Sequence, residues 1–188
     1  QQARLLRELQ AVLPADRYDN DLAADTTTVT DPRLGGTSTV YRARLDGTPV
    51  ASLLTVVAHD GYSGDIHLLV GVTPDGTVTG VRVTQHRETP GLGDKIDLRV
   101  SRWILEFTGR ALGDPPADEW TVRKDGGAFD QFTGATITPR AVVKAVARTL
   151  EVTAERQSQW WSAAAGEAAS RLPTRTPPAT HPAETIDP

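Results

Sequence analysis

The segment Thr39–Val57, TVYRARLDGTPVASLLTVV, decides the fold class of this chain. Its first five residues are rich in β-branched and aromatic side chains, and Val50–Val57 is a second apolar run, so each part has the pattern of a strand. The Asp46-Gly47 step between them is typical of a two-residue hairpin turn. The segment therefore predicts two antiparallel strands.

A second pair of strands follows downstream. Ile66–Val72 is another apolar run, and Val78–Val83 alternates, with Pro74-Asp75-Gly76 as the turn between them. Four strands in succession without intervening helices argue against a parallel sheet built from βαβ units. We predict an α+β fold with a curved, mainly antiparallel sheet flanked by helices.

Three helices are predicted beside this sheet. Apolar residues at helical spacing indicate a short amphipathic helix over 5–13 and a second helix over 96–107. The third begins with Thr138 as its N-cap and Pro139 at its first helical position. Its apolar pattern continues toward Ala164.

The composition excludes several classes of function. The formal net charge of −4 argues against a nucleic-acid partner. Without cysteine there is no thiolate metal site and no thiol catalysis, so redox chemistry would need a cofactor. Neither a P-loop nor a dinucleotide-binding glycine motif is present. The four histidines lack metal-ligand spacing, so no metal site is predicted: His59, His67, His86 and His181.

The chain is predicted to hold one folded domain. We expect an N-terminal helix within 1–17, the main domain over 18–172, and a disordered Pro- and Thr-rich tail over 173–188. The absence of methionine, even at residue 1, indicates a trimmed or processed chain. No apolar run of about 18 residues occurs, so no transmembrane helix is predicted within this sequence, and an anchor upstream of Gln1 stays open.

The stretch Asp130–Pro139, DQFTGATITP, combines three threonines with a Gly-Ala pair just before the last predicted helix. Glycine allows the backbone to approach a ligand closely, and no Glu or Gln completes a capping box at Ala141. An anion carried on Thr136 would lie near the positive end of that helix, with Arg140 close by. An ordinary junction between loop and helix fits the local sequence equally well.

A second glycine-rich stretch, Arg87–Lys95, has the sequence RETPGLGDK. Pro90 stiffens it, and glycines on either side of Leu92 hold that apolar side chain at the tip. Such a loop suits one face of an aromatic ring. A simple connection whose leucine fills a gap is the alternative.

Three segments taken together resemble one family. They are Gly61–Val72 (GYSGDIHLLVGV), His86–Ile96 (HRETPGLGDKI) and Thr133–Thr138 (TGATIT). In order and spacing they resemble the FMN-binding domain of the G subunit of Rnf electron-transport complexes, which is related to the C subunit of the sodium-translocating NADH:quinone reductase. The resemblance extends over about residues 18–152.

The resemblance implies a specific cofactor site without catalytic residues or metal ligands. In this family FMN is attached through its phosphate to the last threonine of the motif, which corresponds to Thr136, by a separate flavin transferase that recognises an upstream aspartate, here Asp130. Thr133, Gly134, Ala135 and Thr138 belong to the same motif. Tyr62 is placed either at the rim of the flavin or in an exposed turn. The residues expected to line the flavin are Glu88, Thr89, Gly91, Leu92 and Gly93, and we infer that Lys95 supplies positive charge near the reduced ring.

The function implied by the resemblance is electron transfer within a membrane-bound Rnf complex. Such a complex passes electrons between ferredoxin and NAD and couples them to cation translocation. The domain is then expected on the periplasmic face of the bacterial inner membrane, held by a single-pass anchor and contacting the other Rnf subunits. As an electron carrier, the isolated domain should lack efficient turnover. Two alternatives are a stand-alone oxidoreductase with non-covalent FMN and an envelope binding module without flavin.

Overall fold

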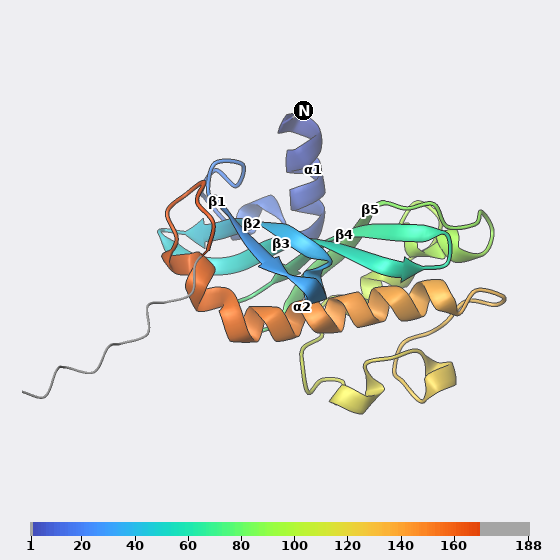
Figure 1. The fold of residues 1–188 in the computed structure, drawn as a ribbon. Coiled ribbons are helices and arrows are strands. Elements are labelled where there is room, and N and C mark those ends of the chain that lie inside the picture. The colour runs from blue at the N-terminus through green and yellow to red at the C-terminus, as the bar shows by residue number, and fades with distance from the viewer. Residues whose placement is uncertain (1, 170–188) are drawn as a thin grey trace, which may run out of the picture.

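A computed structural model describes residues 2–169 as a five-stranded sheet with one helix against each face (Figure 1). The strands run in the order β1-β2-β3-β4-β5, and every neighbouring pair is antiparallel. The predicted α+β class with an antiparallel sheet is therefore confirmed. The main elements are α1 Gln2–Val12, β1 Thr26–Asp31, β2 Gly36–Leu45, β3 Thr48–Gly61, β4 Gly64–Val72, β5 Val78–Gln85 and α2 Ile137–Ser162.

The two hairpins at β3 close in different ways. Between β2 and β3, Asp46 and Gly47 both have positive φ values, of 50° and 76°, as a tight hairpin turn requires. Between β3 and β4, a register shift after Ala58 precedes the pairing of Gly61 with Gly64, which leaves Tyr62 and Ser63 at the tip. This tip projects toward the start of α2 and forms one wall of a cavity there.

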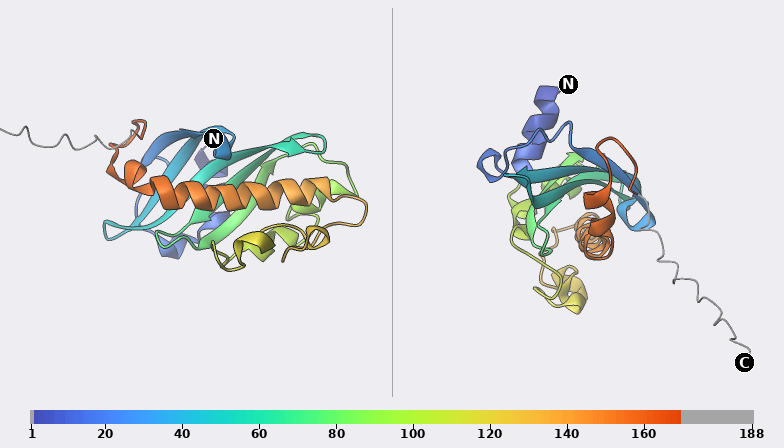
Figure 2. Two further views of the ribbon diagram at one scale, coloured as in Figure 1. Left: turned by 60° about the horizontal axis from the view of Figure 1, so that its bottom comes forward. Right: turned by 90° about the vertical axis from the view of Figure 1, so that its left-hand side faces the viewer.

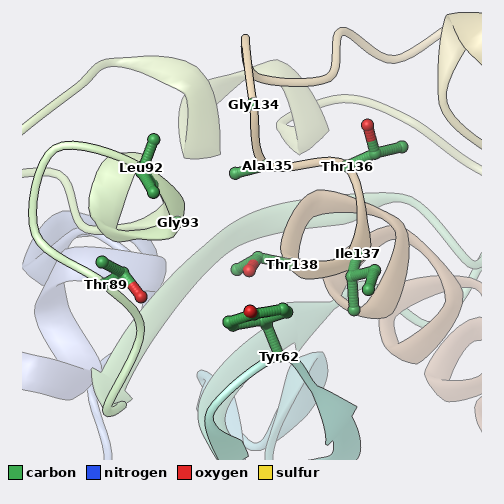
Figure 3. A pocket seen from close by; sticks show the side chains of 9 residues that line it. All are labelled: Tyr62, Thr89, Leu92, Gly93, Gly134, Ala135, Thr136, Ile137 and Thr138. Carbon is green, nitrogen blue, oxygen red and sulfur yellow. The ribbon is translucent and has the colours of Figure 1, made fainter.

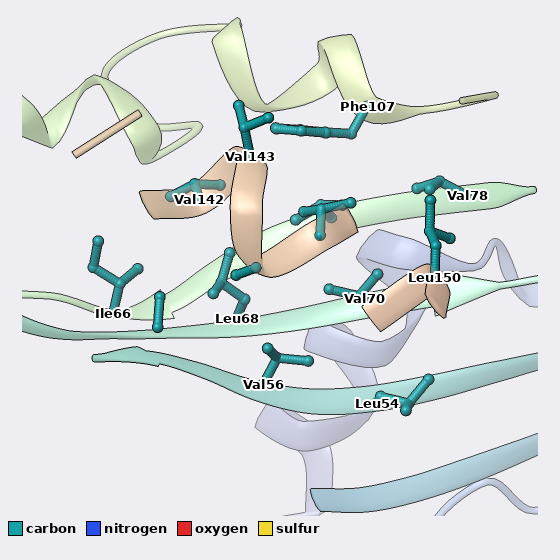
Figure 4. Close-up of a cluster of buried hydrophobic side chains, with 14 of the residues drawn as sticks. Leu54, Val56, Ile66, Leu68, Val70, Val78, Phe107, Val142, Val143 and Leu150 are labelled. Atoms are coloured by element: carbon teal, nitrogen blue, oxygen red, sulfur yellow. The ribbon is translucent and has the colours of Figure 1, made fainter. Parts of the chain in front are cut away.

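The larger core lies between the sheet and α2. Figure 2 shows α2 lying along the face of the sheet, and Figure 4 shows side chains of both elements meeting there. Each fully buried aliphatic side chain of this kind stabilises the fold by roughly 1.5–3 kcal/mol. The contacting residues include Leu54, Val56, Ile66, Leu68 and Val70 from the sheet and Val142, Val143 and Leu150 from α2.

A smaller core lies on the opposite face, under α1. Leu9 and Val12 of α1 are buried together with Leu53 and Leu69 of the sheet. The end of α1 comes so close to β5 that a Cβ on Gly80 would lie 3.0 Å from the Val12 backbone. The predicted amphipathic helix is therefore confirmed.

The predicted helix over 96–107 is wrong. The structure has two short 3₁₀ turns there, Gly93–Ile96 and Trp103–Phe107. Between them, side chains replace the helical hydrogen bonds: Asp97 Oδ1 accepts from the Arg99 N–H at 2.9 Å, and Ser101 Oγ accepts from the Trp103 N–H at 3.2 Å. Such local bonds compete with helix formation.

The apolar residues of this region form an aromatic cluster. Trp103 meets Phe107 and Phe132 edge-on, with ring centroids 5.3 and 5.1 Å apart. Phe129 stacks on Phe107 at 4.8 Å and lies 5.0 Å from Trp120. The cluster fixes the chain between β5 and α2 and leads directly into the segment 133–136.

Two further details differ from the sequence-based prediction. The strand β1 was missed, because Thr26–Asp31 holds a single aliphatic residue, Val29. The helix α2 begins at Ile137 with Thr136 at the N-cap position, so Thr138 lies within the first turn and is not the cap. Pro139 also lies in that turn, where its missing N–H costs no intrahelical bond.

The chain after α2 returns to the sheet. Residues Thr28 and Ala168 form a parallel bridge, and the Gly166 and Ala169 N–H groups donate to the Thr26 and Thr28 carbonyls at 2.7 and 2.8 Å. This contact covers the outer edge of β1. The tail predicted over 173–188 lies outside the described residues. Within 2–169, no helix is long and apolar enough to cross a membrane.

Candidate functional site

A cavity of about 300 Å³ opens where the β3–β4 hairpin tip, the loop after β5 and the start of α2 meet (Figure 3). A volume of this size is at the lower end of the range for sites of small molecules and cofactors. Segments that are far apart in the sequence thus form one concave surface. Its lining residues are Tyr62, Thr89, Leu92, Gly93, Gly134, Ala135, Thr136, Ile137 and Thr138.

Large apolar side chains at this cavity are open to solvent. Tyr62 is 70% exposed, Ile137 46% and Leu92 42%, although all three line the same cavity. In Figure 3, Leu92 and Tyr62 lie on different sides of the cavity, with the Thr138 side chain between Tyr62 and Ala135. Apolar side chains gathered around a hollow are typical of a binding site for a flat apolar group.

Glycine allows the backbone to form two of the cavity walls. Gly134 has a φ of 76° in the turn closed by the hydrogen bond from the Ala135 N–H to the Phe132 carbonyl, at 3.1 Å. Gly93 lies so close to α2 that a Cβ there would come within 2.6 Å of Thr138 Oγ1. Both walls therefore present backbone where a larger residue would not fit or would be strained.

The N-terminus of α2 lies at the edge of this cavity and has no side-chain cap. Thr136 adopts helical angles, and its hydroxyl makes no cap hydrogen bond. Since the first N–H groups of a helix lack intrahelical partners, the amides of Ile137 and Thr138 are available to an anion, and no acidic residue lies in the first turn. Figure 3 shows the Thr136 hydroxyl pointing away from Tyr62 and Thr138.

Glu88 is buried behind the cavity wall. The residue is 4% exposed, and its carboxylate accepts hydrogen bonds from the Tyr62 N–H at 2.9 Å, the Ser63 N–H at 2.7 Å and the Thr138 hydroxyl at 2.7 Å. The resemblance implies that Glu88 lines the flavin, whereas the structure has this residue among the segments that form the wall, outside the lining of the cavity.

Two cationic residues near the site are engaged elsewhere. Arg140 donates to both carboxylate oxygens of Asp125, at 2.7 and 3.1 Å, and this contact lowers the pKa of Asp125. Lys95 Nζ lies 5.9 Å from the centroid of the Phe132 ring, which is a cation–π geometry. Neither side chain lines the cavity, so the N-terminus of α2 is the nearest source of positive potential among the lining residues.

Asp130 lies at the base of the loop that carries Thr136. It pairs with Arg123 and remains half exposed, while its carbonyl accepts a hydrogen bond from the Trp103 indole at 2.9 Å. Burial raises the pKa of the neighbouring Glu106 carboxyl, and the proximity of Asp130 raises it further. The backbone of Asp130 is thus held by the aromatic cluster while its side chain stays accessible.

The remaining predicted residues lie next to the cavity without lining it. Gly91 has a φ of 77° and its N–H donates to Asp94 Oδ1 at 3.0 Å, which shapes the loop that carries Leu92. Thr133 is exposed in the turn before Gly134. Ile137 also lines the cavity and is not among the predicted residues, although an apolar residue between two motif threonines is a usable signal. Among residues 2–169, no cluster of potential metal ligands occurs.

Comparison with known proteins matches this region to one family. The model of the family described as "FMN-binding domain" matches residues 61–151, which include every lining residue of the cavity. The G subunit of the ion-translocating oxidoreductase complex of Vibrio cholerae is 52% identical over 161 residues, which are 85% of this chain and 77% of that protein. The protein of the same name from Escherichia coli K12 is 59% identical over 138 residues, 73% of this chain and 67% of that protein.

A solved structure has the same fold. The crystal structure of Shewanella oneidensis NqrC superposes with a TM-score of 0.51 and covers 83% of this chain and 74% of that chain, at 23% sequence identity. This likeness concerns the fold alone. It agrees with an open antiparallel sheet flanked by helices.

Proposed function

The chain belongs to the G-subunit family of ion-translocating oxidoreductase complexes, and we propose that it carries FMN as a phosphoester on Thr136. Membership of this family supports a role in electron transport through an FMN-binding domain. The covalent linkage, the residues that hold the flavin and the place of the domain in its complex are proposals.

The observation that carries the proposal is the position of Thr136. The residue lies at the N-terminus of a 26-residue helix and lines the cavity, and its hydroxyl makes no cap hydrogen bond. A phosphate ester at this oxygen would lie beside the first amides of α2, where a helix favours an anion by roughly 0.3–1 kcal/mol. The same helix end that lacks a cap thus offers a place for the phosphate.

Attachment of FMN replaces the O–H bond of the Thr136 hydroxyl by an O–P bond. The Oγ atom would form the new bond to phosphorus and lose its proton, while a nucleotide leaves from an activated flavin phosphoanhydride. The protein then gains one FMN less one water. Since a threonine hydroxyl is a weak nucleophile near neutral pH, a separate flavin transferase would supply the catalyst, with the accessible carboxylate of Asp130 as its recognition point.

The residues present fit a flavin in three respects. Leu92 and Tyr62 offer apolar surface on different sides of the cavity, and Ala135 adds little bulk beside them. Gly134 and Gly93 keep backbone rather than side chains at two walls. When bound, the FMN supplies reversible uptake of electrons, and these residues orient it and exclude water from part of its ring.

In the proposed setting the domain relays electrons between the other members of an Rnf complex. Ferredoxin and NAD are the terminal partners, and cation translocation is the coupled process. The domain would lie on the periplasmic face of the inner membrane behind a single-pass anchor. The exposed positions of Tyr62, Leu92 and Ile137 leave a flavin edge open to a partner, which suits an electron carrier better than an enzyme with a closed substrate pocket.

The mass of the denatured protein tests the proposal. Co-expression of the chain with a flavin transferase should add one FMN less water, and Thr136→Ala should abolish the gain while Thr138→Ala retains it. Flavin that dissociates on denaturation would instead indicate a non-covalent FMN oxidoreductase. Protein without any flavin would favour an envelope binding module.

The absence of efficient turnover is tested separately. The flavin-loaded domain on its own should show only slow NADH oxidation, because the cavity proposed to hold the flavin is open, with exposed Tyr62, Leu92 and Ile137 side chains around it. A fast NADH oxidase rate in the purified domain would contradict the role of electron carrier.

A further inference from the structure

Glu88 connects three walls of the cavity through a single carboxylate. The Tyr62 N–H and the Thr138 hydroxyl donate to Oε1 at 2.9 and 2.7 Å, and the Ser63 N–H donates to Oε2 at 2.7 Å. The first and third donors come from the β3–β4 hairpin tip and the second from the first turn of α2. Glu88 itself belongs to the loop after β5, so this one group joins all three segments.

The surroundings of this carboxylate hold it in place. Glu88 is 4% exposed, and its own N–H donates to His86 Nδ1 at 3.0 Å. The loop then returns through Gly93, where a Cβ would lie 3.0 Å from Glu88 Cβ and 2.6 Å from Thr138 Oγ1. A buried charge is tolerated only when its oxygens are well hydrogen-bonded, and here three neutral donors serve that purpose.

Each of the three segments that Glu88 joins carries an apolar residue of the cavity rim. Tyr62 is both a donor and a rim residue, Thr138 follows Ile137, and the loop of Glu88 carries Leu92. Movement of any one segment relative to the others would therefore change the distance between the side chains that face the cavity. Within the described residues, no other side chain bonds to all three segments.

The geometry points to Glu88 as a positioning residue that sets the separation of Tyr62, Leu92 and Ile137 and thereby holds the flavin ring, without contacting it. This inference rests on the proposed function for the identity of the ligand. It differs from a direct flavin contact, because Thr138 acts with Glu88 as one unit and the carboxylate lies behind the wall.

The variant Glu88→Gln tests the inference with little change in shape. Whichever way the amide of Gln is turned, its NH₂ group faces a backbone N–H of Tyr62 or Ser63, so one donor loses its acceptor. Thr138→Val removes the hydroxyl at nearly constant shape, and Thr138→Ser retains it as the matched control.

The first measurement needs no flavin. In the chain without flavin, Glu88→Gln should speed hydrogen exchange of either the Tyr62 or the Ser63 amide, whichever faces the NH₂ group, about tenfold, as expected for loss of one hydrogen bond. Exchange of the Gly76 amide, which donates to the Thr73 carbonyl in the turn between β4 and β5, should stay unchanged. Equal exchange of the Tyr62 and Ser63 amides in the two proteins would overturn the inference.

The second measurement uses the flavin-loaded chain. Glu88→Gln and Thr138→Val should each raise the quenching of flavin fluorescence by iodide. Quenching in the double variant should be only slightly greater than in either single variant, since both substitutions disrupt the same group of hydrogen bonds. Thr138→Ser should match the wild type. Wild-type quenching in both single variants, or an effect of Glu88→Gln that Thr138→Val does not reproduce, would contradict a positioning role.

The two measurements separate this inference from the proposed function. If the wild type takes up no flavin, the proposed function fails, and hydrogen exchange still decides whether Glu88 holds the hairpin tip. If the wild type carries flavin and iodide quenches the flavin fluorescence of the variants no more than that of the wild type, the proposed function stands and the positioning role of Glu88 is wrong.

Discussion

The two ends of α2 differ in how their backbone groups are satisfied. At the C-terminal end, the buried Arg42 donates from Nη1 to the carbonyls of Trp160 and Ala163, at 2.7 and 2.6 Å, and pairs with Asp25 at 2.8 Å. At the N-terminal end, Thr136 forms no side-chain cap. One helix therefore has a closed end inside the protein and an open end at a cavity.

The C-terminal end of α2 contributes mainly to stability, whereas its N-terminal end contributes mainly to the proposed function. Two carbonyls at the closed end, those of Trp160 and Ala163, need no ligand, because a side chain from β2 donates to both. The open end keeps polar groups available and exposes Ile137, which contributes little to the core. Substitutions at the closed end should thus affect folding, and those at the open end should affect the bound flavin.

The largest effect is expected for Arg42→Met. It would leave the last carbonyls of α2 and part of the Asp25 carboxylate unpaired in a buried place, so the free energy of unfolding should fall by about 3 kcal/mol. Urea denaturation measures this loss. Arg4→Met is the control, since Arg4 is 72% exposed and its pair with Glu8 is worth less than about 1 kcal/mol. Equal losses in the two variants would contradict the account of the closed end.

The next effect concerns the pH dependence of stability that arises from the contact of Asp31 with Arg33 and Arg156. Hydrogen bonds from Arg33, and also from Arg156 of α2, lower the pKa of Asp31 to about 2, whereas burial opposes this shift. Because the folded pKa is the lower one, the stabilisation is present above the unfolded value of 3.8 and is lost as the pH falls toward 2.

Asp31→Asn isolates this contribution. At pH 6 the variant should be less stable than the wild type by about 2 kcal/mol, and the difference should shrink between pH 4 and pH 2, the range set by the two pKa values. Chemical denaturation at a series of pH values measures it. A difference in stability that stays constant down to pH 2 would contradict a stabilising contact between the ionised Asp31 and these arginines.

At the open end, Gly93→Ala should destabilise the protein by roughly 1.5 kcal/mol, because the added Cβ would overlap Thr138 Oγ1. The loss should be accompanied by weaker protection of the flavin from iodide. Combining Gly93→Ala with Thr138→Ala should cost less than the sum of the single variants, since the second change removes the overlapping oxygen. Strict additivity in thermal unfolding would argue against this close contact.

The smallest effect on stability is expected for Thr136→Ala. Loss of a threonine that caps a helix usually costs more, but Thr136 forms no cap bond, so the free energy of unfolding should change by less than about 0.5 kcal/mol. The same variant should lose all covalent flavin. A large drop in stability of the protein without flavin would show that the end of α2 is not open.

The sheet could be predicted from the sequence because its signals are local. The Asp46-Gly47 turn and the apolar runs on both sides of it identify β2 and β3 without reference to the rest of the chain. Strand β1 has no such pattern: Asp31 is buried there because Arg33 and Arg156 surround it, which is a tertiary effect. Apolar spacing also predicted a helix where Asp97 and Ser101 bond to nearby amides.

The site could be predicted only in part. The resemblance connected the glycine-rich loop to the threonine motif, and the structure brings both to one cavity. The start of α2 could not be located, since the Thr138 hydroxyl that suggested a cap bonds to Glu88, 50 residues earlier. Local sequence likewise gives no sign that Lys95 lies over Phe132.

Fragmentation of the tryptic peptide Asp125–Arg140 tests the central claim most directly. This peptide holds Thr133, Thr136 and Thr138, and cleavage between them in the mass spectrometer locates the adduct on one residue. Protein co-expressed with a flavin transferase should carry one FMN less water on Thr136, at the open end of α2. The adduct on Thr138, whose hydroxyl the structure assigns to Glu88, would contradict the account.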